Sequence, residues 1–237
     1  MKTLSIILPV YNNQDELKKN IGYLTEFFNQ KAISYEIIIV DDCSSNAGEI
    51  IEIADDYNCL YIRNEKNSGK GESVKRGMLK ASGKYRLFTD ADIPYEKEGI
   101  ELMLEKLDKE KFDVVIGDRT LFKSEYKNGS FLRSTGSRIF SLIVRELTSG
   151  KFPDTQCGLK GFTAESAETL FRKTKIKGFA VDVELLYLAL MHNYKIGKVP
   201  VKLRSHSVST VSVIKHGFQM VVDLMKIKIY RLRKKYE

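Results

Sequence analysis

The chain has 237 residues, of which 43% are hydrophobic and 30% are charged, a composition that allows a sizeable core and excludes a disordered chain. No apolar run approaches the roughly 20 residues that a membrane-spanning helix needs, and the apolar stretch near the start is too short for a signal peptide, so we expect a cytosolic protein. The three cysteines form no C-x-x-C pair, which indicates neither a disulfide framework nor a zinc site.

Segments that predict strands alternate with segments that predict helices along the first half of the chain. The strand segments are 4–10, 35–40, 59–64, 85–88 and 112–119, and the helix segments between them are about 17–28, 47–57, 71–81 and 97–109. Parallel strands joined by helices form right-handed crossovers, so we expect an α/β fold with a mainly parallel, Rossmann-like central sheet flanked by helices.

The pattern changes beyond Arg119. Residues 131–150 predict a long helix, and they are followed by a short strand at 157–163, helices at 164–174 and 182–193, and a last strand at 195–204. Pro200 indicates that this last strand lies at an edge or contains a bulge. Because there is neither a linker nor a repeat, we expect one domain over 1–212, followed by a terminal helix at 213–237.

Polar side chains follow each of the first five predicted strands. In open α/β sheets, ligands bind beyond the carboxyl ends of the strands, so these side chains are expected to converge on one pocket. They are Tyr11, Asn12 and Asn13, then Asp41 and Asp42, then 67–71, then Asp90 and Asp92, and finally Asp118 and Arg119.

Asp90 and Asp92 are separated only by Ala91 and directly follow an apolar strand. Two carboxylates at this spacing can both reach one hard cation, and Mg²⁺ or Mn²⁺ takes one or two protein carboxylates together with water and substrate phosphates. A solvated turn is the alternative for an isolated D-x-D, but the position among converging strand ends favours the metal site.

The segment NSGKGESVKRG at 67–77 is rich in glycine and in basic residues. It lacks the spacing of a Walker loop and the third glycine of G-x-G-x-x-G, because Val74 stands there. Gly69 would permit close approach of the backbone to a phosphate or ribose, and Lys70 would supply charge. An ordinary turn is the alternative.

Several motifs resemble a known family: SIILPVYNN, EIIIVDDCSS, NSGKGESVKRGM, FTDAD and VVIGDR, in this order and spacing. Together they are similar to the nucleotide-sugar half of family-2 glycosyltransferases, which have the GT-A fold. FPDTQCGLKGFT, GFAVDVELLYLA and KVPVKLR resemble the branch that transfers a hexose to dolichyl or polyprenyl phosphate, most like the dolichyl-phosphate β-glucosyltransferases. The resemblance extends from about Leu4 to Thr210, with 1–119 as the nucleotide-sugar half and 120–212 as the acceptor half.

The resemblance implies roles for individual residues. Asp92 and Asp154 would be catalytic, the latter by positioning or by stabilising positive charge on the sugar ring, and Asp90 with Asp92 would hold Mg²⁺ or Mn²⁺. The residues implied for the nucleotide sugar are Pro9, Tyr11, Asn13, Val40, Asp42, Gly69, Lys70, Asp90 and Ala91. Those implied for the acceptor phosphate are Arg119, Arg133, Arg138, Lys160 and Arg204.

Three positions depart from the family pattern. Asn13 stands where many relatives have a glutamate, Pro94 where mannosyl relatives offer a glutamine to the metal, and Thr210 where relatives often have a lysine. The resemblance therefore favours UDP-glucose as the donor, with GDP-mannose as the alternative. It implies an inverting, metal-dependent transfer.

A phosphate acceptor reduces the need for a general base, because a monoester with a second pKa of about 6 is already ionised at pH 7. The three histidines, His192, His206 and His216, form no ligand spacing and are expected to be surface or capping residues. Asp182 and Glu184 are expected either to face the site from a helix N-terminus or to act as plain caps.

Residues 213–237 contain seven lysines and arginines against two acidic residues, and their apolar side chains recur at helical spacing. A basic amphipathic helix of this kind can lie on an anionic membrane, which predicts peripheral attachment at the cytoplasmic face. The alternatives are packing on its own domain, on a second subunit, or on a membrane protein.

Two other classes of protein are less consistent with the sequence. A nucleic-acid-binding module would fit the pI near 9.2, but aspartates at the strand ends would repel phosphates without a metal, so no nucleic-acid partner is expected. A dinucleotide-dependent oxidoreductase would need the missing third glycine.

Overall fold

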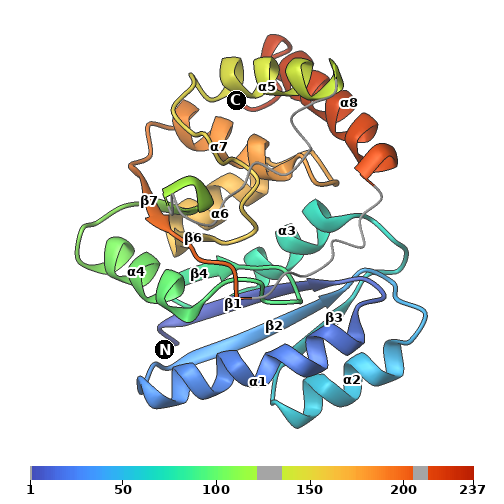
Figure 1. Ribbon diagram of the computed structural model, residues 1–237, viewed down its shortest axis with the longest axis vertical. Helices are drawn as coiled ribbons and strands as arrows, with labels where there is room; N and C mark the ends of the chain where they lie inside the picture. Colours follow the sequence, from blue (N-terminus) through green and yellow to red (C-terminus); the bar gives the residue numbers. More distant parts are fainter. Residues whose placement is uncertain (1, 122–134, 205–212) are drawn as a thin grey trace.

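The computed structural model describes residues 2–121, 135–204 and 213–237, and its centre is a seven-stranded sheet in the order β3-β2-β1-β4-β6-β5-β7 (Figure 1). The strands are β1 (Leu4–Val10), β2 (Tyr35–Asp41), β3 (Leu60–Arg63), β4 (Tyr85–Phe88), β5 (Val114–Asp118), β6 (Lys160–Thr163) and β7 (Ile196–Pro200). The helices are α1 (Gln14–Gln30), α2 (Ala47–Asp56), α3 (Lys70–Lys80), α4 (Lys97–Asp108), α5 (Thr135–Leu147), α6 (Ala164–Lys173), α7 (Val181–Met191) and α8 (Val213–Leu232), with a short 3₁₀ turn at Arg119–Leu121.

The sheet is mainly parallel, as the sequence predicted. β1 pairs in parallel with β2 and β4, β2 with β3, and β5 with β7, whereas β6 runs antiparallel to both β4 and β5. β7 lies at one edge of the sheet and Pro200 is its last residue, which confirms the edge position predicted for this proline.

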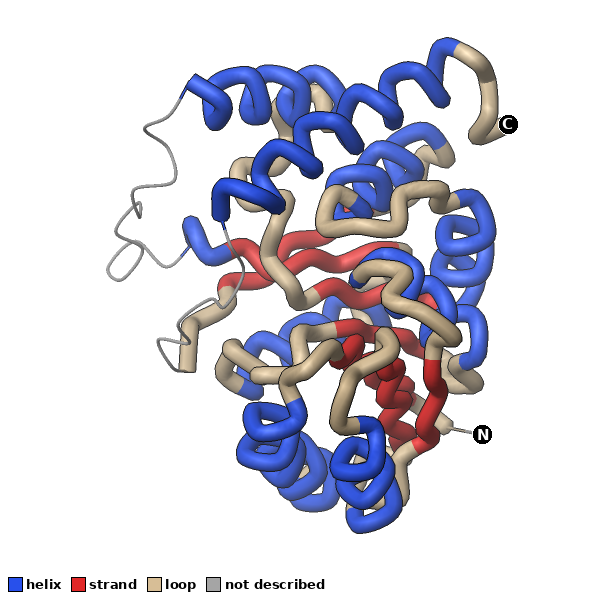
Figure 2. Tube along the Cα trace, turned by 90° about the vertical axis from the view of Figure 1, so that its right-hand side faces the viewer, coloured by secondary structure: helices blue, strands red, loops and turns tan. Residues whose placement is uncertain are grey.

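Two layers of helices cover the sheet (Figures 1 and 2). In β1, the buried side chains of Leu4, Ile6 and Leu8 point to the face that α1, α2 and α4 cover, while Ile7 points to the opposite core with α3, α6 and α7. This alternation is the period of two that a strand imposes. Because β1 to β4 are parallel, the predicted nucleotide-binding loops that follow them lie at the same end of the strands, their carboxyl ends.

α8 forms an outer layer with α5, and part of its surface is buried by its own domain. Met220, Leu224 and Ile227 are buried, as the alternative of packing on the same domain requires. Phe218 and Leu232, in contrast, are 75% and 80% exposed. No helix in the described ranges is both long and apolar enough to cross a bilayer.

Close packing of α3 on the sheet depends on the absence of a side chain at Gly77. A Cβ atom there would lie 2.5 Å from Ile7 Cγ2 and 3.0 Å from Val40 Cγ2. Gly77→Ala is expected to lower the free energy of unfolding by about 1–3 kcal/mol, because this core has no room for an added methyl group. Urea titration followed by circular dichroism measures the change.

Gly48→Ala is the matched control, because a Cβ atom at this exposed helical position would meet nothing within 4 Å. It is expected to leave stability unchanged or to raise it by about 0.5 kcal/mol through helix propensity. Equal losses in the two variants would contradict the packing explanation.

Candidate active site

The two aspartates of the D-x-D sequence lie on a tight turn at the carboxyl end of β4. The N–H of Ile93 donates to the carbonyl of Asp90 at 2.9 Å and closes the turn. Ile93 has φ = 44° and is buried, an unusual backbone conformation for a β-branched residue. Such strain persists only where the surroundings enforce it, so the directions of Asp90 and Asp92 are fixed by the fold.

Lys70 and Gly158 contact Asp90 from two other segments. Lys70 Nζ lies 2.5 Å from Asp90 Oδ1, and a Cβ atom at Gly158 would overlap Asp90 Oδ2. Burial lowers the pKa of Lys70, but the carboxylates of Asp90 and Asp182 outweigh it, so the pKa lies above its ordinary value. Lys70 therefore stays charged beside Asp90.

The donor set of this turn fits a hard divalent cation. Within the described ranges, no group of three or more His, Cys, Asp and Glu side chains is arranged to hold a metal. Mg²⁺ and Mn²⁺ need no such cage, because one or two carboxylates and substrate phosphates suffice. Lys70 already pairs with Asp90 Oδ1, so a metal ion bound to Asp90 would share this carboxylate with an ammonium group that repels it.

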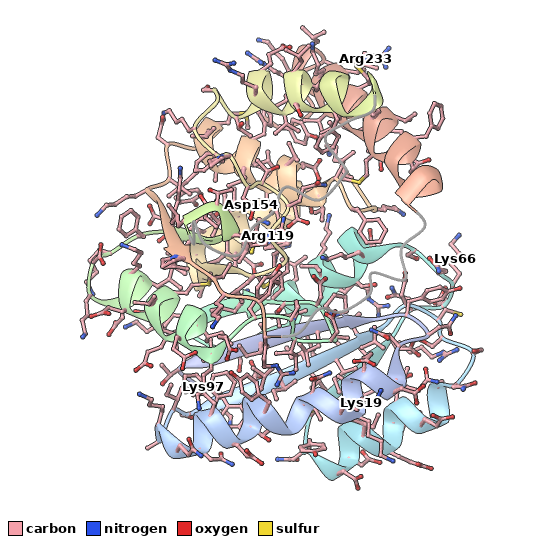
Figure 3. All side chains as sticks on the ribbon, viewed as in Figure 1. Lys19, Lys66, Lys97, Arg119, Asp154 and Arg233 are labelled. Carbon is pink, nitrogen blue, oxygen red and sulfur yellow. The ribbon has the colours of Figure 1, made fainter. Side chains whose placement is uncertain are left out.

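Arg119 and Asp154, which were assigned to the acceptor and to catalysis, form a bidentate ion pair (Figure 3). Arg119 donates from Nε to Oδ2 at 2.8 Å and from Nη2 to Oδ1 at 2.7 Å, and its backbone N–H donates to Oδ2 at 3.0 Å. Burial raises the pKa of Asp154, but Arg119 outweighs it and lowers the pKa below its ordinary value. Asp154 thus remains ionised and orients Arg119.

Lys160, which was assigned to the acceptor phosphate, is 1% exposed and has no free donor. Its Nζ donates to Asp182 Oδ1 at 2.6 Å, to the carbonyl of Cys157 at 2.7 Å and to the carbonyl of Thr155 at 3.1 Å. In this arrangement Lys160 cannot contact a phosphate, since all three N–H groups are used. It instead ties the loop that carries Asp154 to the start of α7.

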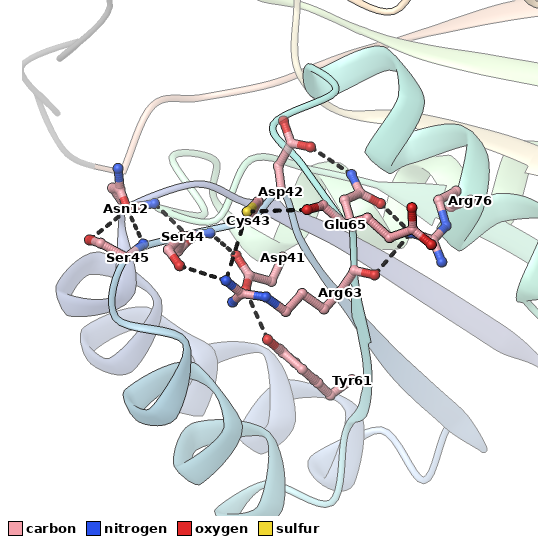
Figure 4. A network of polar contacts seen from close by, with 11 residues as sticks. Asn12, Asp41, Asp42, Cys43, Ser44, Ser45, Tyr61, Arg63, Glu65 and Arg76 are labelled. Carbon is pink, nitrogen blue, oxygen red and sulfur yellow. Dashed lines mark hydrogen bonds and ion pairs between the residues drawn. The ribbon is translucent and has the colours of Figure 1, made fainter.

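A polar network joins the loops after β1 and β2 (Figure 4). Asn12 accepts from the backbone N–H of Ser45 at 2.9 Å, and Ser44 Oγ accepts from the backbone N–H of Asn12 at 2.9 Å. Asp41 is fully buried and pairs with Arg63. Tyr11 is 51% exposed beside this network.

Asp42 organises the glycine-rich loop. Its carboxylate accepts from the backbone N–H groups of Ser68 at 2.8 Å and Gly69 at 2.7 Å, and from Asn64 Nδ2 at 2.6 Å. These amides are therefore occupied within the protein, which differs from the expectation that the loop offers them to a phosphate. Lys70 is the part of the loop that faces Asp90.

The remaining residues predicted to bind the nucleotide sugar or the acceptor differ from one another in burial. Val40 is fully buried in the core, whereas Pro9 and Asn13 are half-buried and Ala91 lies buried within the D-x-D turn. The Arg204 backbone N–H donates to the carbonyl of Pro94 at 2.8 Å, close to the D-x-D turn.

The guanidinium of Arg204 lies 4.1 Å from the centre of the Tyr23 ring and donates to Asn20. It is thus engaged on α1. Arg133 and Thr210 lie outside the described residues, and Arg138 is on α5 with its side chain outside the described part.

Two residues that hold the site together, Tyr95 and Gly158, were not predicted from the sequence. Tyr95 Oη accepts from the backbone N–H of Gly158 at 2.9 Å, and it holds the Asp154 loop against the D-x-D turn. Gly158 belongs to the quoted motif and could have been found as a close-approach glycine. Tyr95 carries no sequence signal, because its partner is a backbone amide.

A mainly parallel sheet with a D-x-D turn at its carboxyl edge defines a nucleotide-sugar transferase of the GT-A class. The family described as Glycosyl transferase family 2 matches residues 5–171. The chain therefore belongs to glycosyltransferase family 2 and is a hexosyltransferase enzyme.

Curated relatives match almost the whole chain. It is 35% identical to a dolichyl-phosphate beta-glucosyltransferase of Dictyostelium discoideum, covering 95% of this chain and 73% of the relative. The enzyme of the same name from Homo sapiens is 28% identical, with 96% and 75% covered.

Solved structures share the fold at low identity. Glucosyl-3-phosphoglycerate synthase from Mycobacterium tuberculosis superimposes with a TM-score of 0.72 at 18% identity, covering 95% of this chain and 80% of that one. A complex of the same enzyme with Mn²⁺, UDP and glucosyl-3-phosphoglycerate gives a TM-score of 0.69 at 17% identity, covering 95% and 80%. At this identity the similarity establishes the fold alone.

The Arg119–Asp154 pair predicts a pH-dependent contribution to stability. Because the folded-state pKa of Asp154 is lowered, the contribution is present above the ordinary value of about 3.9 and is lost as pH falls through the folded value. Asp154→Asn is expected to cost about 3 kcal/mol at pH 7 and progressively less below pH 4. Urea unfolding at several pH values measures both.

Asp55→Asn, an exposed change on α2 with the same change in charge, is the control and is expected to be nearly neutral. A cost of Asp154→Asn that stays constant down to the acid end of the titration would contradict the ion-pair explanation.

Proposed function

We propose that the chain transfers glucose from UDP-glucose to dolichyl or polyprenyl phosphate, with inversion and with a divalent metal. The observation that carries this proposal is the convergence of the D-x-D turn, Lys70 and the Arg119–Asp154 pair at one edge of the sheet. The similarity to named dolichyl-phosphate beta-glucosyltransferases supports the acceptor and the sugar.

The chemical problem is electrostatic, because an anionic diphosphate and an anionic acceptor phosphate must approach one anomeric carbon. In the proposal Lys70, which lies beside Asp90, binds the leaving diphosphate, and Asp90 and Asp92 would hold Mg²⁺ or Mn²⁺. When bound, the metal would neutralise the charge that develops on the leaving group. The Mn²⁺–UDP complex of the structural neighbour supports a divalent metal in this fold.

We assign the acceptor phosphate to Arg119. It is partly exposed, stays protonated, and is aimed by Asp154, so we assign Asp154 to positioning. An acceptor oxygen bonds to the anomeric carbon as the bond from that carbon to the diphosphate oxygen breaks. A single displacement of this kind inverts the configuration and needs no covalent nucleophile.

Other predicted acceptor residues take different roles in this proposal. Lys160 positions the Asp154 loop, since its donors are filled. Arg204 is a candidate for the acceptor path, because its backbone adjoins Pro94, although its guanidinium is engaged by Asn20 and Tyr23. Arg133 and Arg138 remain proposals from the resemblance.

Glucose is preferred to mannose because Pro94 offers no side-chain ligand to the metal. The test supplies purified protein with dolichyl phosphate, Mn²⁺ or Mg²⁺, and either UDP-glucose or GDP-mannose, and detects lipid-linked hexose. Product from UDP-glucose alone supports the proposal. Product from GDP-mannose alone would reverse the choice of donor.

We also propose that α8 attaches the protein to an anionic membrane at the cytoplasmic face. α8 and α5 lie together at one end of the molecule (Figure 1), both carry exposed apolar side chains, and α8 also contains lysines and arginines. The apolar side chains are Leu142 at 67%, Phe218 at 75%, Met225 at 47%, Ile229 at 43% and Leu232 at 80% exposed. An acceptor with an isoprenoid tail must be met at a membrane.

Asp92→Asn is expected to lower transfer by at least about a hundred-fold, because it removes one of the two carboxylates that hold the metal. The initial rate of lipid-linked glucose formation measures the loss, and circular dichroism checks that the fold is retained. Asp55→Asn serves again as the control and should keep full activity. Full activity of Asp92→Asn would overturn the metal assignment.

The double variant Phe218→Ser with Leu232→Ser is expected to weaken binding to phosphatidylserine vesicles by at least about ten-fold, because it removes apolar surface that would enter the bilayer. Vesicle sedimentation measures the bound fraction. Ile51→Ser, which changes a 41% exposed apolar residue on α2 at the opposite end of the molecule, is the control. Equal binding of the double variant and the control would leave α8 as a helix that packs only on its own domain.

A further inference from the structure

Residues 174–178, which connect α6 to α7 and are called the clasp below, hold the start of α3. The carbonyl of Lys177 accepts from the backbone N–H groups of Gly71 at 2.7 Å and Glu72 at 3.3 Å. These amides belong to the first turn of α3, where N–H groups lack the usual partner four residues earlier; that of Glu72 also donates to the carbonyl of Gly69 at 3.1 Å, so the Gly71 amide depends more on the clasp. The clasp therefore fixes the position from which Lys70 reaches Asp90.

The glycines of the glycine-rich loop make this contact between α3 and the clasp possible. A Cβ atom at Gly69 would lie 2.5 Å from the carbonyl oxygen of Lys177, and one at Gly71 would lie 2.5 Å from that of Ile176. Gly69 also has φ = 94°, a conformation that favours glycine. The close approach that the glycines permit is thus to the clasp backbone.

The clasp is held in turn by Glu184, a fully buried carboxylate in the first turn of α7. Glu184 Oε2 accepts from the N–H of Ile176 at 2.9 Å, and Oε1 accepts from the N–H of Lys175 at 3.0 Å. Tyr236 Oη donates to Glu184 Oε1 at 2.6 Å. Lys75 adds a second tie from α3, since its Nζ donates to the carbonyl of Thr174 at 2.9 Å.

Tyr236 is itself fixed from several sides. It is 2% exposed, and its ring lies 5.8 Å from that of Tyr187 and 6.1 Å from that of Tyr230 between ring centres. Lys173 Nζ donates to its carbonyl at 2.7 Å. Burial first, and then the charge of Glu184, raise the pKa of Tyr236, so its hydroxyl remains a donor.

The clasp is packed on one side, where Ile176 is 4% exposed in the core, and borders a pocket on the side that faces α8. A pocket of about 350 Å³ lies there, between the clasp, residues 67–69 and α8, and neither Asp90 nor Asp92 lines it. Lys175, Lys177 and Lys226 are among its walls. The hydrogen bonds to Glu184 and the burial of Ile176 together fix where the clasp backbone lies.

We propose that Glu184 and Tyr236 are positioning residues for donor binding, acting through the clasp on the first turn of α3 and so on Lys70. The inference rests on the proposed function in taking the nucleotide diphosphate as the ligand of Lys70. It links the segment that follows α8 to the donor site, so the seating of the proposed membrane helix and the affinity for the donor are coupled.

The test uses Tyr236→Phe in the full chain, which removes the hydroxyl and keeps the ring. Hydrogen exchange of the Gly71 and Glu72 amides is expected to become faster, because Glu184 loses a donor and the clasp loosens. Calorimetry with UDP and Mn²⁺ is expected to give a Kd about five-fold higher. In steady-state assays the KM for the nucleotide sugar rises, while the KM for the lipid phosphate stays unchanged. Glu184→Gln, which keeps the size of the side chain, is expected to have the larger effect.

Tyr230→Phe is the matched control, since Tyr230 lies beside Tyr236 but makes no hydrogen bond to Glu184 in the described part. Unchanged exchange of the two amides in Tyr236→Phe would overturn the inference, and so would faster exchange with an unchanged Kd for UDP. Failure of the proposed function is seen separately, as the absence of lipid-linked glucose with the wild-type chain.

Discussion

Burying carboxylates at one edge of a sheet is the constraint on which the rest of this structure depends. Removing the partner of a buried charge costs several kcal/mol, so each carboxylate needs a cation or amides close to it. Here the partners come from segments distant in the sequence, and the pairs therefore fasten the loops to one another. Three of the pairs contain a buried carboxylate, namely Asp41 with Arg63, Asp154 with Arg119 and Asp182 with Lys160, and the fourth joins the half-buried Asp90 to Lys70.

Much of the fold could be predicted from the sequence, because apolar periodicity reports directly on burial in strands and helices. The mainly parallel sheet, the edge position of Pro200 and the D-x-D turn after β4 all follow from local patterns. The sequence also singled out Arg119 and Asp154, but a pattern along the chain cannot indicate that two charged residues 35 positions apart neutralise each other. Lys160 was misassigned for the same reason, since nothing local distinguishes a buried lysine from an exposed one.

The glycine-rich loop shows a second limit of sequence reasoning. Glycine indicates that something approaches the backbone closely, and a phosphate or a ribose was the expected partner. The partner is the backbone of residues 176 and 177, which has no side-chain signature. In the proposed function the loop serves the donor through Lys70, and Asp42 and Lys177 hold its backbone in place.

The reversed direction of β6 has a mechanical consequence. In a wholly parallel sheet, only the loops that follow the strands lie at their carboxyl ends, where ligands bind. Because β6 is antiparallel, the loop that precedes it lies at this end as well. Asp154 and Gly158 therefore lie in the loop just before β6, a strand that is hydrogen-bonded to β4 on one side and to β5 on the other. Any displacement of this loop along the strand direction is resisted by the backbone hydrogen bonds that join β6 to both neighbouring strands. The part of the site that orients Arg119 is thus stiff.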